Sequence, residues 1–75
     1  MLSKHTLYNI SSNLKYLRNK NNYTQIEISH YLEMERKGYQ KIEYGQIKDV
    51  KLSTILKILN FYNISLEKLI SKNID

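Results

Sequence analysis

Apolar residues recur at three- and four-residue spacing along nearly the whole chain, and this spacing constrains the fold most strongly. Leu7, Ile10, Leu14 and Leu17 follow it, and the pattern stops at residues 19–22, a run that favours turns. Such spacing gives a helix one apolar stripe that can be buried against other helices. The sequence therefore predicts helices throughout, the first over about residues 6–20, and no credible strand.

Two short helices are predicted in the middle of the chain. Thr24 and Glu27 form a capping-box pattern, in which each side chain accepts a hydrogen bond from the other residue's backbone N–H. The expected core contacts of this helix are Ile28, Tyr31 and Leu32. After a turn at residues 33–34, the next helix covers about residues 35–44. It ends at Gly45, which readily adopts the left-handed conformation that closes helices.

Two further helices follow a polar loop at residues 46–50. The apolar positions of the fourth helix are Leu52, Ile55, Leu56, Ile58 and Leu59. Asn63 is expected to close it in the left-handed conformation, and Ser65 caps the fifth helix. The apolar stripe of that fifth helix is Leu66, Leu69 and Ile70. The expected architecture is all-α, with five helices in a single domain over residues 1–75, since no repeat or Gly/Ser linker divides it.

Length and composition limit the possible functions. Seventy-five residues are too few to enclose a deep substrate cavity, and no nucleophile–base pair, carboxylate dyad or phosphate loop is visible. A binding module is therefore favoured over an enzyme. The chain has no cysteine, and neither His5 nor His30 has the other histidine or a carboxylate at the spacing that metal ligands require. No metal, cofactor or small-molecule substrate is therefore expected. No apolar run approaches the roughly 20 residues of a membrane span, and no secretory signal is apparent, which predicts a cytoplasmic protein without membrane contact.

The charge balance indicates a class of partner. Twelve Lys and Arg against seven Asp and Glu give a net charge of +5. Such a surplus attracts polyanions through long-range potential and counterion release. The same surplus also fits a role in solubility alone, so it does not identify the partner.

The helix predicted over residues 35–44 has two different faces. At about 100° per residue, one arc holds Arg36, Lys37, Gln40 and Lys41, and the opposite arc holds Tyr39 and Ile42. A helix that enters the major groove of DNA needs long hydrogen-bonding side chains on one face and a buried apolar ridge on the other. The segment is suited to reading DNA, although four polar residues on a helix are also usual for a solvated face. Three tyrosines, Tyr16, Tyr31 and Tyr39, lie near core stripes and are expected to pack there.

A set of residues in register resembles one known family. The set comprises Arg18, Thr24-Gln25, Ser29, Ile42-Glu43-Tyr44-Gly45 and the pattern NISLEKLI. From about residue 13 to residue 70 the chain resembles the Cro/repressor-like, or Xre-type, helix-turn-helix domain of phage repressors and bacterial regulators. The resemblance implies a compact five-helix, lambda-repressor-like domain whose second and third helices form the helix-turn-helix. The implied function is a sequence-specific DNA-binding transcriptional regulator.

The resemblance also implies roles for individual residues. Gln25 would touch a phosphate or brace the groove-facing helix. The implied base-reading residues are Arg36, Lys37, Gln40 and Lys41, since Arg and Lys suit guanine O6 and N7 and Gln suits adenine N6 and N7. Tyr44, Gln46 and Lys48 would follow the sugar–phosphate backbone. Arg18 and Glu43 would form a structural ion pair between the first and third helices.

Three residues depart from the family pattern. Glu33 replaces the usual glycine in the turn, where a positive φ costs roughly 1 kcal/mol. Glu35 replaces the usual Ser or Thr cap, and both glutamates put negative charge near the docking face. Gly38 costs about 1 kcal/mol relative to Ala, but its lack of bulk would permit close approach to DNA. These departures leave open a helical protein-interaction module, antitoxin-like or adaptor, as the alternative function.

A homodimer on a palindromic operator is expected, because one recognition helix contacts only a few base pairs of double-stranded DNA. The apolar surface expected to form it comprises Leu66, Leu69, Ile70 and Ile74. The same residues equally fit the core of the monomer. Repression would follow from blocking polymerase and activation from contacting it, and the sequence does not decide between them.

Overall fold

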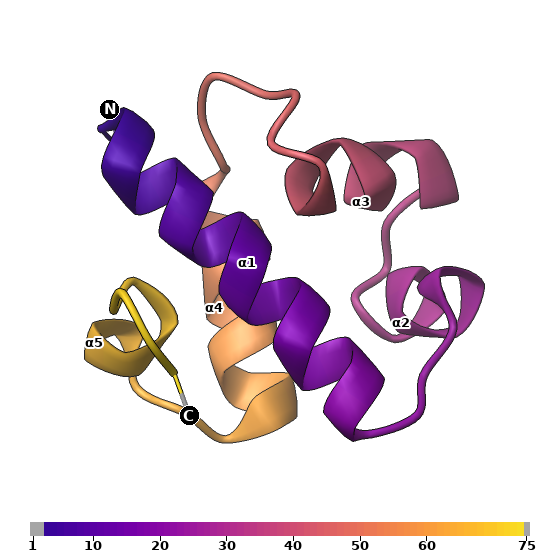
Figure 1. Cartoon of the computed structure of the whole chain (residues 1–75). Helices are drawn as coiled ribbons and strands as arrows, with labels where there is room; N and C mark the ends of the chain where they lie inside the picture. The colour runs from indigo at the N-terminus through magenta and orange to yellow at the C-terminus, as the bar shows by residue number, and fades with distance from the viewer. Residues whose placement is uncertain (1–2, 75) are drawn as a thin grey trace.

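The computed structural model describes residues 3–74 and folds them into five α-helices without a strand. The helices are α1 (Lys4–Lys20), α2 (Gln25–Tyr31), α3 (Arg36–Glu43), α4 (Leu52–Tyr62) and α5 (Leu66–Leu69). Figure 1 shows α1 crossing the molecule, with α2 and α3 on one side of it and α5 on the other. The predicted all-α class with five helices is confirmed. No helix within these residues is long and apolar enough to cross a membrane.

Side-chain caps explain where most helices begin. The Ser3 hydroxyl accepts a hydrogen bond from the Thr6 N–H at 3.1 Å, so α1 begins two residues before the predicted start. Both hydrogen bonds of the predicted capping box at Thr24 are present, and Ser65 caps α5 as expected. The exceptions are α3 and α4, whose cap positions hold Glu35 and Lys51 without a side-chain hydrogen bond. The start of α3 therefore lacks one of the interactions that usually stabilise a helix end.

Four left-handed residues close the first four helices. Asn22, Glu33, Gly45 and Asn63 have φ angles of 60°, 56°, 68° and 53°. After each of them, the next backbone N–H donates to the carbonyl five positions earlier, at 2.8 to 3.1 Å. This contact satisfies a carbonyl that the helix would leave without a partner. Glu33 is the costly member of the set, because its Cβ is strained in this conformation, whereas Gly has no Cβ and Asn visits the conformation routinely.

The core cluster joins α1 to all the other helices. Its buried members are Ile10, Leu14, Ile28, Leu32, Tyr39, Ile42, Val50, Ile55, Ile58 and Leu69. The predicted burial of Tyr39 is confirmed, but the prediction was wrong for Tyr16 and Tyr31, which are 37% and 55% exposed. Tyr31 ends α2 and stacks at the surface on Phe61, with ring centroids 5.4 Å apart. The Lys20 ammonium lies over the Tyr16 ring, 5.7 Å from the ring centroid.

The apolar residues of α4 divide between the core and the surface. Ile55 and Ile58 are buried, whereas Leu52 and Leu56 are 70% and 55% exposed. The two exposed leucines lie one turn apart, rotated away from the direction of the buried isoleucines. The spacing alone could not show this, because α4 has apolar residues on more than half of its circumference.

The stripe predicted on α5 and the tail also divides. Leu69 is fully buried, and Ile70 and Ile74 are half-buried, whereas Leu66 is 48% exposed. Leu69 thus belongs to the core of the single chain, and Ile70 packs against it. Of the four residues expected at a dimer surface, Leu66 is the one that is exposed.

Polar residues of α1 hold the ends of two other helices. The buried Asn13 amide donates to the carbonyl of Leu69, the last residue of α5, at 2.7 Å and to that of Ser71, just after the helix, at 2.9 Å. The buried Ser11 hydroxyl donates to the Ile42 carbonyl at the end of α3. These contacts satisfy carbonyl groups that would otherwise be buried without partners. They also fix α3 and α5 relative to α1.

Candidate nucleic-acid interface

The α3 helix presents one face to the core and the other to solvent. Its buried residues Tyr39 and Ile42 are 0% and 4% exposed. Of the residues predicted to read bases, Arg36, Lys37 and Lys41 are exposed and Gln40 is half-buried. The structure therefore brings these four side chains to one side of a short helix that is braced from behind by α1 and α2.

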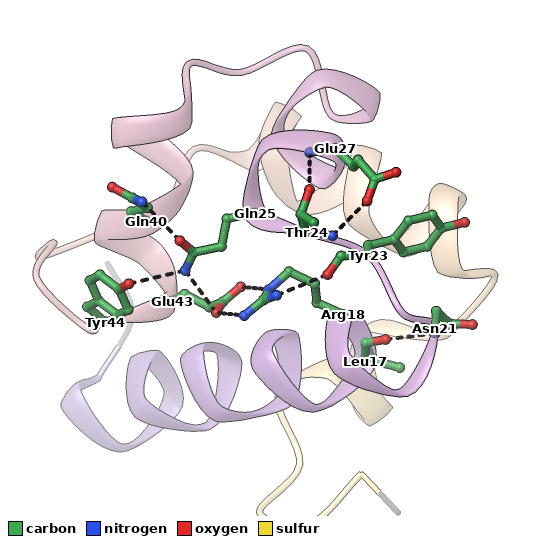
Figure 2. A network of polar contacts seen from close by, with 10 residues as sticks. All are labelled: Leu17, Arg18, Asn21, Tyr23, Thr24, Gln25, Glu27, Gln40, Glu43 and Tyr44. Atoms are coloured by element: carbon green, nitrogen blue, oxygen red, sulfur yellow. Dashed lines mark hydrogen bonds and ion pairs between the residues drawn. The ribbon is translucent and has the colours of Figure 1, made fainter.

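A hydrogen-bond network connects α2 to α3 through Gln25 (Figure 2). The Gln40 amide nitrogen donates to the Gln25 carbonyl oxygen at 2.9 Å. The Gln25 amide nitrogen in turn donates to Glu43 Oε1 and to the Tyr44 hydroxyl, both at 3.3 Å. Because an ionised carboxylate only accepts, Glu43 fixes which end of the Gln25 amide faces it. The Gln25 oxygen must then face Gln40.

This arrangement determines which hydrogen-bonding groups of Gln40 remain free. One of its two N–H groups is used by Gln25, so the second N–H and the carbonyl oxygen remain free. A donor and an acceptor side by side match the N7 and N6 groups of adenine in the major groove. Gln40 is therefore held in an orientation that can make two hydrogen bonds to one base.

Arg18 and Glu43 join α1 to the last turn of α3. Arg18 Nε lies 2.8 Å from Glu43 Oε2, and its Nη2 lies 2.9 Å from Oε1. Arg18 Nη1 also donates to the Tyr23 carbonyl at 3.0 Å. The Glu43 side chain is fully buried, and burial raises its pKa. Hydrogen bonds from Arg18 and Gln25 more than offset that effect, so the pKa of Glu43 lies below its ordinary value of 4.5.

Two buried tyrosine hydroxyls lie near this ion pair. Neither Tyr39 nor Tyr62 makes a side-chain hydrogen bond with good geometry within the described residues. The Tyr39 hydroxyl nevertheless lies close enough to Glu43 to interact with its charge. Burial raises the pKa of both tyrosines, and the negative charge of Glu43 raises it further. Both hydroxyls therefore stay protonated; the Tyr39 ring belongs to the core cluster and the Tyr62 ring packs against it.

A shallow depression of about 510 Å³ lies beside the Gln25 network. Its lining includes three cationic side chains, Lys15, Arg18 and Arg36, together with Gln40 and Tyr44. Lys15 was not among the residues predicted from the sequence. The available signal was its spacing, because it precedes Arg18 by three residues on a helix and so shares the same face.

The predicted backbone-contacting residues follow α3. Tyr44 is 54% exposed, and Gln46 and Lys48 are exposed in the segment between α3 and α4. The Tyr44 hydroxyl accepts a hydrogen bond from Gln25, which leaves its own O–H free to donate. These three residues thus continue the polar surface past the end of α3.

The three departures have different structural consequences. The Glu33 carboxylate lies 3.7 Å from Lys57 on α4, so it is directed towards α4. Such an exposed pair adds little stability. Glu35 is exposed at the start of α3 and does leave negative charge there. A Cβ atom at Gly38 would meet the Met34 methyl at 3.8 Å, an ordinary contact, so the missing side chain faces the turn between α2 and α3.

Comparison with protein families gives one match. A family model described as helix-turn-helix matches residues 14–69, from the middle of α1 to the end of α5. The matched span contains the Gln25 network, the Arg18–Glu43 pair and the whole of α3. No curated protein and no solved structure matches the chain.

Proposed function

Because the chain belongs to the helix-turn-helix family of the Cro/C1 type, we propose that it is a sequence-specific transcriptional regulator that reads double-stranded DNA with α3. The observation that carries this proposal is a polar arc on α3, with Arg36, Lys37 and Lys41 exposed and Gln40 half-buried, on a helix whose other face is buried. Arg36 and Lys37 are assigned to guanine, and Gln40 to adenine. Lys41 reaches a base or a phosphate one turn later.

The internal hydrogen bonds favour one of the two roles considered for Gln25. Both of its amide hydrogens and its carbonyl oxygen already have partners within the protein. Gln25 is therefore proposed to brace Gln40 and not to bind a phosphate. The phosphate contacts then fall to Tyr44, Gln46 and Lys48, with Lys15 as an addition from α1.

The proposed regulator acts as a symmetric dimer on a palindromic operator, because a single short helix reads too few base pairs for useful specificity. Leu52 and Leu56 on α4 are the proposed interface, since they are exposed large apolar residues one turn apart. Leu69 is excluded from this role by its burial. Sedimentation analysis tests the assignment: Leu56→Glu should shift the protein to monomer, whereas Leu69 variants should instead unfold.

Random-oligonucleotide selection followed by salt-titrated anisotropy tests the DNA-binding function. An enriched palindrome is expected, and binding should weaken steeply with salt. Arg36→Ala should lose about 1–3 kcal/mol of preference among sequences, whereas Lys48→Ala should weaken all sequences similarly and reduce the salt slope by about 1. A chain that ignores duplex DNA at low salt would favour the protein-interaction module. The uncapped, negatively charged Glu35 at the start of α3 is the feature consistent with that alternative.

A further inference from the structure

A groove of about 570 Å³ opens between the first turns of α1 and the segment that follows α3. Leu7 and Ile47 form its apolar floor and pack against the core cluster. Lys4 and Lys48 line it from opposite elements, and both are exposed. Among residues 3–74, no acidic side chain lines the groove. It is thus an apolar cleft with a cationic rim.

Two tyrosines flank the same groove with most of their surface in solvent. Tyr8 is 72% exposed and Tyr44 is 54% exposed. Within the described part of the chain, neither ring contacts another aromatic ring, unlike Tyr31, which stacks on Phe61. Exposed rings with a polar tip suit a partner that is apolar in one part and polar in another.

The groove is continuous with the proposed DNA interface. Tyr44 lines both the groove and the depression that contains Gln40 and Arg36. The polar surface of α3 therefore leads directly into the groove, past the C-terminal end of that helix. A duplex lying along α3 would reach this region with its backbone and not with its base edges.

We propose that this groove binds the DNA sugar–phosphate backbone next to the site read by α3, with α1 as a second backbone-contacting element. Lys4 and Lys48 neutralise phosphates, while Tyr8 and the floor pack against deoxyribose. The chemistry agrees, because the backbone alternates anionic phosphates with less polar sugars. A second copy of this chain is a poorer occupant, since its net charge of +5 would be repelled by the cationic rim. The inference rests on the proposed function.

Salt-titrated binding of point variants to the selected operator tests the charge contribution. Lys4→Ala should reduce the slope of log affinity against log salt by about 0.9, the value for one phosphate contact, and should weaken related and unrelated sequences equally. Lys68→Ala is the matched control, because it removes the same charge from α5, on the other side of α1 from α3 (Figure 1). That variant should keep the wild-type slope. Lys4 and Lys68 are both exposed, so neither change should unfold the protein.

Hydroxyl-radical footprinting tests the sugar contact, because the radical attacks deoxyribose. Protection of sugars beyond those covered by α3 should be lost in Tyr8→Ala and kept in Tyr8→Phe. Wild-type slope and footprint in both Lys4→Ala and Tyr8→Ala would overturn this inference alone. Absence of duplex binding by the wild-type chain would overturn the proposed function as well. A drop in oligomeric state on Tyr8→Ala would assign the groove to a second copy of the chain and would also overturn it.

Discussion

Arg18 donates hydrogen bonds to both carboxylate oxygens of Glu43, at 2.8 and 2.9 Å, and so links α1 to the last turn of the helix that is proposed to read DNA. The Glu43 side chain is completely shielded from solvent, and that of Arg18 is 13% exposed. The same carboxylate also accepts a hydrogen bond from the Gln25 amide nitrogen (Figure 2). One buried charge thus connects the stability of the fold to the orientation of the side chains on α3.

Removing Arg18 should therefore be costly. Arg18→Met leaves the Glu43 charge buried without its main partner, which is expected to lower the free energy of unfolding by about 3–5 kcal/mol. Urea denaturation measures the change. The double variant Arg18→Met/Glu43→Leu should recover much of the loss, because it removes the unpaired charge as well. A loss below about 1 kcal/mol in the single variant would show that the pair does not hold α3.

Acid should weaken the fold through the same carboxylate. The pKa of Glu43 is lowered in the folded chain, since the hydrogen bonds from Arg18 and Gln25 outweigh the opposing effect of burial. A lowered pKa gives stability that is fully present above the unfolded value, about 4.5, and is lost as pH falls through the lower folded value. Denaturation from pH 7 to pH 2 should show this loss below about pH 4.5. Glu43→Gln should be less stable at pH 7 and should show a shallower decline in acid.

Local features of the sequence predicted the fold better than they predicted surfaces. The Thr24 capping box and the left-handed closure at Gly45 depend on neighbours within a few positions, so they could be identified from the residues alone. The two faces of α3 follow in the same way from helical spacing. These features were sufficient to place the predicted base-reading residues on one polar arc, of which Gln40 is half-buried and the other three are exposed.

Contacts between distant parts of the chain could not be predicted. The hydrogen bonds of Asn13 reach carbonyls 56 and 58 residues away, and nothing near Asn13 in the sequence indicates them. The exposure of Tyr31 and of Leu56 is likewise set by how α2 and α4 pack, since their spacing alone fits a core position. The orientation of Gln25 also depends on bringing α2, α3 and α1 together.

A substitution at Gly38 tests whether the low helix propensity of this residue serves DNA binding. Gly38→Ala should raise the free energy of unfolding by about 1 kcal/mol, because Ala favours helix and its Cβ would make an ordinary contact with Met34. DNA affinity should not change, since that Cβ faces the turn. Gly45→Ala is the matched control and should be destabilising, because its φ of +68° is strained for Ala. Loss of DNA binding by a stable Gly38→Ala protein would instead indicate close approach of the duplex at this position.

The brace between Gln25 and Gln40 should control base preference more than affinity. In Gln25→Ala, the Gln40 amide is free to rotate, so its donor and acceptor are no longer held in a fixed order towards adenine. Discrimination at the base contacted by Gln40, about 1–3 kcal/mol in the wild type, should fall, while preference at other positions remains. Competition anisotropy with single-base operator variants measures this position by position.

Two comparisons separate this brace from a general loss of structure. Gln46→Ala also removes a glutamine side chain but lies outside the network, so it should weaken all operators alike and leave base preference intact. The double variant Gln25→Ala/Gln40→Ala should discriminate no worse than Gln40→Ala, because the two residues act through one contact. If the two losses of discrimination add, Gln25 must act on DNA by a separate route, such as a direct phosphate contact, and the brace is not its function.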